Sequence, residues 1–322
     1  MIKLEEARVL VTPTSYAKND PCLRTELEAA VGEVIYNTTG RPFTADQLIK
    51  IIPDFDGYIA GLDAVTKDVI AAADRMKVIA RYGVGVDKVD LEAAQERGIV
   101  VTNTPGANSS SVAELTVGLM IALVRHIPAA HVSIKSGEWP RLRGATLEGK
   151  TIGLYGFGAI GQIVAKQLSG FGCELIVYDP CMNQQIAEEL RVEDVSSDEI
   201  VKRSDILSLH CPVVKKTRKM VDSDFLDLMK PGSLLVNTAR GELVDEMALY
   251  DAITQGHIAG AALDVFCDQP PDPENPLLNL SQVVATPHMG AHTDSATNNM
   301  GWSAFRNCLA VLIGEEPPNR VI

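Results

Sequence analysis

The chain has 322 residues and a net charge of −13, and 46% of its residues are hydrophobic against 22% charged. This length suits two domains, and the composition is that of a globular protein and not of a disordered or fibrous one. The negative charge argues against nucleic acids and acidic membranes as partners.

Short β-branched runs alternate with longer helix-period segments, which is typical of parallel α/β sheets. The first predicted strands are Arg8–Val11, Glu33–Tyr36, Gly57–Ala60, Lys77–Ala80 and Ile99–Thr102, with helices such as Asp20–Val31 and Lys67–Ala73 between them. A second series follows at Thr151–Tyr155, Glu174–Tyr178, Ile206–His210, Ser233–Asn237, Gly260–Asp264 and Val283–Thr286. Two series predict two parallel-sheet domains, so we expect an α/β fold with two Rossmann-like or flavodoxin-like domains.

A long apolar segment, Ser109–Ile127, joins the two series. A helix that is apolar on all faces is buried on all sides, so we expect it between domains or in a subunit interface of a homodimer. Pro128 should kink or end this helix. The last predicted helix, Ser295–Ile313, could return the chain to the first domain.

The termini and the cysteines bear on localisation. Acidic residues stand near the start, where a signal peptide would be apolar. The six cysteines show no C-x-x-C pair and no regular spacing, which favours reduced thiols over a disulfide framework or a zinc site. We therefore expect a cytoplasmic protein without a bound metal.

A glycine-rich turn follows the strand Thr151–Tyr155, with the sequence Gly156-Phe157-Gly158-Ala159-Ile160-Gly161. In this pattern Gly156 permits the tight turn, Gly158 lets a pyrophosphate approach the backbone, and Gly161 allows close helix packing. The predicted helix Ile160–Ser169 follows, and its N-terminus, with Ala159 and Ile160, offers N–H groups to the anion. Asp179 ends the next strand and can accept hydrogen bonds from an adenosine ribose, while repelling a 2′-phosphate. The turn therefore predicts an NAD site.

Several further segments together resemble the D-isomer-specific 2-hydroxyacid dehydrogenases, in their phosphoglycerate-dehydrogenase-like branch. They are Arg81–Asp87, Asn108–Glu114, His210–Pro212, Val236–Gly241, Leu263–Phe266 and Thr286–Gly290. The resemblance covers nearly the whole chain. It implies an NAD-binding domain over residues 99–287, inserted into a substrate domain made of residues 1–98 and 288–322, with the active site in the cleft between them.

Oxidation of a 2-hydroxy acid needs a carboxylate anchor and an acid/base. Arg240 follows a buried-type strand and has the forked donors that suit a carboxylate. His288 stands at the carboxyl end of another strand, where its ordinary pKa suits proton transfer. His210 and His292 are rivals for this role; for His292 a surface or core role is the simpler interpretation.

Two glycines in the loop Gly83-Val84-Gly85 let consecutive N–H groups converge on a substrate carboxylate, although a plain β-turn has the same composition. Asn108 could hydrogen-bond the substrate or cap the following helix. The resemblance further implies that the remaining cofactor contacts come from a set of residues on the strand ends, namely His210, Pro212, Thr217, Thr238 and Asp264.

The chain departs from the family at the third catalytic residue, because Gln269-Pro270 replaces the usual Glu-Pro. A glutamate there would raise the pKa of the histidine, whereas Gln269 can orient the ring without adding charge. Three hypotheses follow: the hydroxy-acid chemistry persists with a lower histidine pKa, Asp268 supplies the charge, or the substrate differs and needs less proton transfer, as in formate dehydrogenases of this family. An NAD(H)-sensing or inactive relative is a further alternative.

A second departure concerns the substrate. Phosphoglycerate dehydrogenases usually carry Arg-Ser after the third strand of the substrate domain, and this chain has Gly61-Leu62-Asp63. A phosphate beside Asp63 would need another cation. The alternative substrate 3-phosphoglycerate therefore requires Arg81, Lys18, or Arg141 or Arg143 from a partner subunit.

Overall fold

The computed structural model describes residues 3–322 and divides into two compact units. The first unit runs to Asn108 and resumes from Ala291 to the C-terminus, and the second comprises Ser109–Gly290. The predicted fold class, with one α/β domain inserted into another, is confirmed. The predicted boundaries were placed too early, since residues 99–108 and 288–290 were assigned to the other domain. The reason is the strand after Gly98, which pairs within the first sheet.

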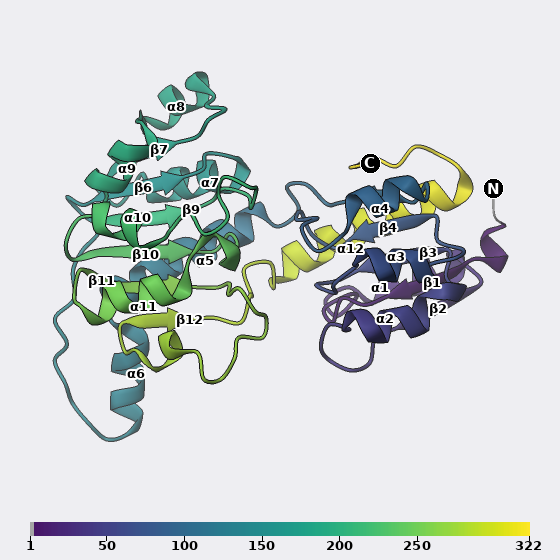
Figure 1. The fold of residues 1–322 in the computed structure, drawn as a ribbon, viewed down its shortest axis with the longest axis horizontal. Coiled ribbons are helices and arrows are strands. Elements are labelled where there is room, and N and C mark those ends of the chain that lie inside the picture. Colours follow the sequence, from purple (N-terminus) through teal and green to yellow (C-terminus); the bar gives the residue numbers. More distant parts are fainter. Residues whose placement is uncertain (1–2) are drawn as a thin grey trace. The chain divides into compact units, whose positions relative to one another are not determined.

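The first unit holds a five-stranded parallel sheet in the order β2-β1-β3-β4-β5 (Figure 1). Its strands are β1 (Arg8–Val11), β2 (Glu33–Tyr36), β3 (Gly57–Ala60), β4 (Val78–Arg81) and β5 (Val100–Thr102). Its helices are η1 (Leu4–Glu6), α1 (Pro21–Ala30), α2 (Ala45–Ile51), η2 (Ile52–Asp54), α3 (Lys67–Ala72), α4 (Leu91–Glu96) and α12 (Asp294–Ile313). All five predicted strands are confirmed to within one residue, and the last helix does return to this sheet.

Successive side chains of a strand in the first unit point to opposite faces of the sheet, and each face has its own hydrophobic core. In β1, Val9 and Val11 pack under α1 and α12, whereas Leu10 faces the layer made by α2, α3 and α4. The sheet is therefore covered on both faces, which is why its strands read as continuous hydrophobic runs.

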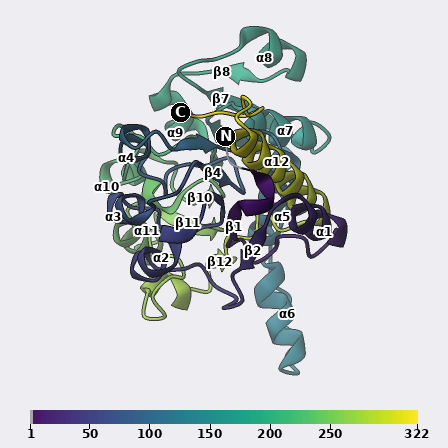
Figure 2. The same ribbon diagram turned by 90° about the vertical axis from the view of Figure 1, so that its right-hand side faces the viewer.

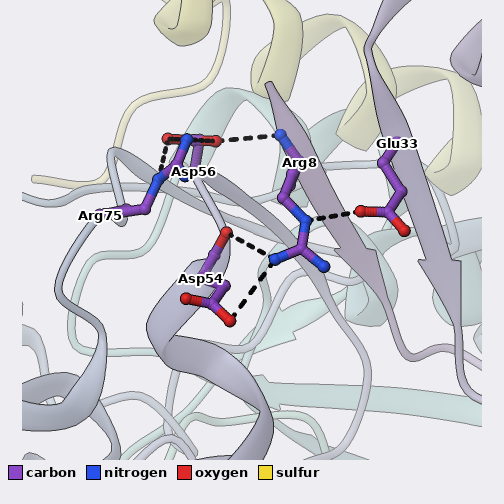
Figure 3. Close-up of polar contacts among 5 residues, drawn as sticks. All are labelled: Arg8, Glu33, Asp54, Asp56 and Arg75. Atoms are coloured by element: carbon purple, nitrogen blue, oxygen red, sulfur yellow. Dashed lines mark hydrogen bonds and ion pairs between the residues drawn. The ribbon is translucent and has the colours of Figure 1, made fainter. Parts of the chain in front are cut away.

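An ion-pair network lies at the amino-terminal ends of three strands of this sheet (Figure 3). Asp56 is 2% exposed and accepts hydrogen bonds from the backbone N–H of Arg8 at 2.9 Å and from both Nε and Nη2 of Arg75. The Arg8 guanidinium pairs with Glu33 and Asp54. These charges satisfy one another at the sheet edge opposite the carboxyl ends, so we assign them to stability.

The second unit holds a seven-stranded parallel sheet in the order β12-β11-β10-β9-β6-β7-β8. Its strands are β6 (Thr151–Tyr155), β7 (Glu174–Tyr178), β8 (Glu193–Asp194), β9 (Ile206–Leu209), β10 (Ser233–Asn237), β11 (Ile258–Leu263) and β12 (Val283–Ala285). Its helices are α5 (Ser109–Val124), α6 (Ile127–Lys135), α7 (Ala159–Leu168), α8 (Gln184–Leu190), α9 (Ser197–Arg203), α10 (Ser223–Leu228), η3 (Gly241–Leu243), α11 (Glu246–Thr254) and η4 (Pro276–Asn279). The short strand β8 was not predicted, because two exposed acidic residues carry no strand signal.

Helix α5 belongs to the core of the second unit. It packs on α7 and on the strands β10, β11 and β12, and ten of its sixteen residues are buried. This packing accounts for the apolar faces that the sequence analysis assigned to a domain or subunit boundary. The helix ends at Val124, before Pro128, because His126 adopts a left-handed conformation and α6 starts at Ile127. Pro128 occupies the first turn of α6, where a missing N–H costs nothing.

No single helix in residues 3–322 is long and apolar enough to cross a membrane; α5 and α6 reach that length only together, with a bend of 63° between them.

Candidate active site

The glycine turn of the second unit has the geometry of a dinucleotide loop. A Cβ on Gly156 would lie 2.6 Å from the carbonyl carbon of His210, and one on Gly161 would lie 2.4 Å from the Gly156 carbonyl oxygen, so neither position accepts a side chain. Gly158 is exposed, with no atom within 4 Å of where its Cβ would lie. It starts α7 without a side-chain cap, so the first N–H groups of this ten-residue helix face open space. These features fit the pyrophosphate of NAD.

Asp179 is tied to this turn. Its Oδ2 accepts a hydrogen bond from Phe157 N at 2.7 Å, and its Oδ1 accepts one from Cys181 N at 2.8 Å. Each carboxylate oxygen can accept more than one hydrogen bond, so these contacts fix the carboxylate and leave capacity for a ribose hydroxyl. The ribose contact itself stays a prediction.

His210 follows β9 and is partly buried beside the glycine turn. Its Nε2 lies 2.9 Å from Ser208 Oγ, and burial lowers the pKa of this imidazole to about 4. A histidine with this pKa is neutral at physiological pH and a poor partner for proton exchange near neutrality. This lowered pKa favours the role of a cofactor contact for His210 over the role of the catalytic acid/base.

Two predicted cofactor residues brace loops at the strand ends. Thr217 Oγ1 donates to the Pro212 carbonyl oxygen at 2.7 Å and accepts from Val214 N at 2.8 Å, which holds the loop after β9. Thr238 Oγ1 lies 2.7 Å from the hydroxyl of Thr116 on α5. Their contacts with a cofactor stay predictions.

His288 and Gln269 form a direct pair. Gln269 Nε2 donates to the Phe266 carbonyl oxygen at 3.0 Å, which turns its Oε1 toward His288 Nδ1 at 2.5 Å. Because Oε1 can only accept, Nδ1 carries the proton in this pair. The ring is therefore held in the tautomer whose Nε2 exchanges the substrate proton. The Gln269–His288 pairing predicted from the sequence is present.

The backbone of His288 adopts φ = 50°, a left-handed conformation that is uncommon for residues other than glycine. Asp264 holds this turn. Its carboxylate, 1% exposed, accepts hydrogen bonds from Thr286 Oγ1 at 2.6 Å and from the backbone N–H groups of Met289 and Gly290 at 2.9 Å each. Asp264 is also one of the cofactor contacts that the resemblance implies, and that contact stays a prediction. What the structure adds is a role in fixing the His288 turn.

Arg240 follows β10, and its backbone is fixed from both sides. The Asn237 amide donates to the Arg240 carbonyl oxygen at 2.8 Å and accepts from Ala239 N at 3.0 Å. A Cβ on Gly241 would lie 2.0 Å from the Phe266 carbonyl carbon, so only glycine allows the Arg240 segment to lie against the segment that leads to Gln269. Arg240, Gln269 and His288 all belong to the second unit.

The loop Gly83–Gly85 belongs to the first unit, at the carboxyl end of β4. All three of its carbonyls accept hydrogen bonds, from Thr104 N at 3.0 Å, Asn103 Nδ2 at 2.8 Å and Arg81 Nε at 3.0 Å. Among the described residues, its three N–H groups donate to no protein acceptor. A loop anchored by its carbonyls with its N–H groups available suits a carboxylate. Asn108 Oδ1 is buried with no partner within residues 3–322, so a capping bond to α5 is not found.

The residues after β3 show where the missing cation of this branch would stand. Asp63 is 1% exposed and turned inward, where its carboxylate accepts hydrogen bonds from the hydroxyls of Thr12 and Tyr58 and from Phe43 N. Leu62 beside it is 41% exposed. The exposed side chain after β3 is therefore apolar, and the nearby guanidinium of Arg81, a residue 5% exposed, donates to the carbonyl oxygens of Ala60 at 2.6 Å and Gly85 at 3.0 Å. Within residues 3–322 there is no group of three or more metal-ligating side chains.

Glu246, which the sequence analysis did not single out, joins two parts of the site. It begins α11, and its carboxylate accepts hydrogen bonds from Cys267 N at 2.7 Å and Asn275 Nδ2 at 2.6 Å. Both partners lie more than twenty residues away in sequence, so no local pattern could have revealed these contacts.

Comparison with known proteins shows the family to which the chain is related. Residues 117–290 match the model of the D-isomer-specific 2-hydroxyacid dehydrogenase NAD-binding domain. The chain is 46% identical over 295 residues to D-3-phosphoglycerate dehydrogenase of Methanocaldococcus jannaschii, covering 90% of this chain but only 56% of that protein. It is 44% identical to hydroxypyruvate reductase of Thermotoga maritima, covering 88% of this chain and 93% of that protein. An NAD-dependent formate dehydrogenase from Staphylococcus aureus, solved with NAD, superposes with a TM-score of 0.87 at 31% identity, covering 98% and 99% of the two chains.

Proposed function

The chain belongs to the D-isomer-specific 2-hydroxyacid dehydrogenase family of NAD-dependent oxidoreductases, and on that basis we propose that it interconverts a small, unphosphorylated D-2-hydroxy acid and its 2-keto acid. The observation that carries the proposal is the Gln269–His288 pair, held in one tautomer beside the Arg240 segment. NAD would be held by Gly156–Gly161 and Asp179 and would supply the hydride acceptor or donor.

The residues of this chain perform the other tasks. Arg240 anchors the substrate carboxylate with its forked donors, and the N–H groups of Gly83–Gly85 hold the same group from the first unit. His288 Nε2 gives a proton to the keto oxygen during reduction and takes it back during oxidation. Gln269 keeps the ring oriented through Nδ1.

The preference for an unphosphorylated substrate rests on the residues after β3. A phosphate dianion needs a cation there, and the exposed side chain is Leu62 while Asp63 is buried and already satisfied. The chain spans about half the length of the phosphoglycerate dehydrogenase relative, which carries no argument for either substrate. Oxidation of 3-phosphoglycerate remains the second candidate, because that relative is 46% identical.

A panel of 2-keto acids tests the proposal, with oxidation of NADH as the readout. We expect turnover of glyoxylate, hydroxypyruvate or pyruvate to exceed that of phosphohydroxypyruvate. A preference for phosphohydroxypyruvate would support the second candidate. No turnover of any acid, together with tight NADH binding, would support an NAD(H) sensor.

Replacing Gln269 by Glu should raise the pKa that controls the reaction. A carboxylate 2.5 Å from Nδ1 stabilises the protonated imidazole, and such a neighbour shifts a pKa by about 1–3 units. Reduction needs protonated His288, so its rate falls as the pH rises through this pKa. In the variant, this falling limb of the pH profile should move to higher pH. The limb should be measured as kcat/KM for the keto acid against pH.

Asp268→Asn is the matched control, since it changes a neighbouring carboxyl to an amide. Asp268 is exposed, and Gln269 supplies the hydrogen bond to Nδ1, so this variant should leave the limb in place. A downward shift in Asp268→Asn would instead show that Asp268 supplies the charge.

We further propose that the protein is a homodimer built on α6, which projects from its unit in both views (Figures 1 and 2). None of the residues of α6 is buried; Val132 is 64% exposed and Trp139, in the following loop, 81%. A groove of about 490 Å³ runs along α5 and α6, lined by Ile121, Arg125, Ile127, Ala130, His131 and Ile134. A contiguous apolar surface of this kind marks a protein interface, and a second copy can pair isologously through it.

Light scattering after size exclusion tests the dimer. The wild type should have twice the mass of the chain, and Val132→Glu with Ile134→Glu should shift it toward the monomer. A monomeric wild type would contradict the proposal.

A cytoplasmic location also stays a proposal, supported by the six unpaired cysteines.

A further inference from the structure

We propose that Glu246 is a positioning residue that sets the orientation and tautomer of His288 by clamping both ends of the loop that carries Gln269. The inference rests on the proposed function for its kinetic consequence, but its structural part stands on the contacts alone. Glu246 contacts neither His288 nor Gln269, and no role was assigned to it from the sequence.

The clamp is made of two hydrogen bonds from opposite ends of one loop. Glu246 Oε1 accepts from Cys267 N at 2.7 Å, two residues before Gln269, and Oε2 accepts from Asn275 Nδ2 at 2.6 Å, six residues after it. The Asn275 amide is itself oriented, because its Oδ1 accepts from Leu277 N at 3.1 Å at the start of η4. One carboxylate therefore fixes the entry and the exit of the segment between them.

The clamp matters because the orientation of the Gln269 amide depends on the backbone beside Cys267. Its Nε2 donates to the carbonyl of Phe266, the residue next to Cys267. A displacement of the Phe266–Cys267 peptide therefore moves the acceptor that orients the Gln269 amide. An amide that turns over would present Nε2 to His288 Nδ1, and the neutral ring would then prefer the opposite tautomer.

Glu246 also links this loop to the carboxylate anchor. It lies six residues after Arg240 on the same segment, and Gly241 packs directly on the Phe266–Cys267 peptide. The carboxylate bonds across this contact to both ends of the loop of Gln269, and the Cys267 thiol adds a weaker bond from its Sγ to the Val244 carbonyl oxygen at 3.8 Å. Its neighbour Cys267 stays a thiol, since burial and then the Glu246 charge raise its pKa to about 12. The carboxylate thus faces two hydrogen-bond donors and no competing thiolate.

Kinetics of four variants test the proposal. Glu246→Gln keeps the shape but offers one acceptor to two donors, so kcat should fall by about 10- to 100-fold, the cost of a small misplacement of reacting groups. The KM for the keto acid and the Kd of NADH should change little, because Arg240 and the glycine turn remain. Glu274→Gln is the matched control: it removes an exposed carboxylate from the same loop and should behave as wild type.

Rescue separates the clamp from a general loss of stability. In Glu246→Gln with Asn275→Asp, the new amide at 246 can accept from Cys267 N and donate to the new carboxylate at 275, which can still accept from Leu277 N. We expect kcat to recover most of the loss, whereas Asn275→Asp alone, which opposes two carboxylates, should be impaired. A double variant no better than Glu246→Gln would overturn the proposal.

Imidazole ¹⁵N chemical shifts give a readout that does not depend on activity. Wild type should show His288 as the Nδ1–H tautomer above its pKa, and Glu246→Ala a mixture of tautomers. If wild type reduces no keto acid, the proposed function fails while this measurement still tests the clamp. Unchanged shifts in a folded Glu246→Ala would overturn the inference.

Discussion

Replacing His288 by Gln should lower kcat for keto-acid reduction by about 10²- to 10⁴-fold, the range that general acid/base catalysis contributes. Nδ1 is committed to Gln269 at 2.5 Å, so Nε2 is the nitrogen that can exchange the proton. A glutamine amide can still donate a hydrogen bond to the keto oxygen, but it cannot release a proton. NADH binding should stay near the wild-type level, because the glycine turn is a separate part of the unit.

The pH profile identifies the group that is lost. Desolvation lowers the pKa of His210 to about 4, so this ring is neutral near pH 7 and contributes no limb there. A limb near neutrality in the wild type would therefore report His288, and it should disappear in His288→Gln. His292→Gln, which alters the exposed rival, should keep both the rate and the limb. A large loss in His292→Gln with a mild effect in His288→Gln would reverse the assignment.

The sequence predicted the strands well because both sheets are parallel and covered on two faces. Such strands are runs of β-branched residues, as in Thr151–Tyr155, and their ends are marked by glycine or charged residues. The glycine turn was equally clear from its spacing after a strand, although only Gly161 is required by a contact within the turn, whereas Gly156 is required by its contact with His210, 54 residues away. These signals are local in the chain, and so they can be seen without the fold.

The domain boundary and the packing partners of α5 could not be read from the sequence, for a shared reason. Strand β5 contains only three residues, and its membership is decided by pairing with β4, which periodicity does not reveal. Likewise the apolar faces of α5 predicted burial correctly, but not that α7 and the strand layer of one unit provide it. Burial can be read from a pattern, whereas the partner that provides it cannot.

The side-chain contacts that shape the candidate site were the least predictable. Asp264 holds the His288 turn from 24 residues away, and Glu246 reaches Asn275 across 29 residues. The sequence suggested that the Asp63 carboxylate lies near the substrate phosphate. In the structure this carboxylate faces Thr12 and Tyr58 inside the unit. The direction in which a carboxylate points depends on donors brought by distant elements.

The second large effect is expected at Arg240. Replacing it by Lys keeps the positive charge but removes the planar fork, so one of two charge-assisted hydrogen bonds to the substrate carboxylate is lost. Such a bond contributes about 1.5–3 kcal/mol, which corresponds to a decrease in kcat/KM of about 10- to 150-fold. Arg240→Gln removes the charge as well and should cost about 10²- to 10⁴-fold, if both bonds are lost.

The comparison of these two variants is what makes the test specific. The Arg240 backbone is held by Asn237 and by the packing of Gly241, and both variants keep these contacts while losing the bond from Nη1 to the Ala239 carbonyl oxygen at 2.7 Å, so folding of each variant is checked by its melting temperature. Arg218→Lys, an exposed change on the same unit, serves as the control. Equal losses in Lys and Gln variants would mean that the fork, and not the charge, carries the binding. Wild-type kcat/KM in both would remove Arg240 from the site and leave the N–H groups of Gly83–Gly85 as the carboxylate anchor.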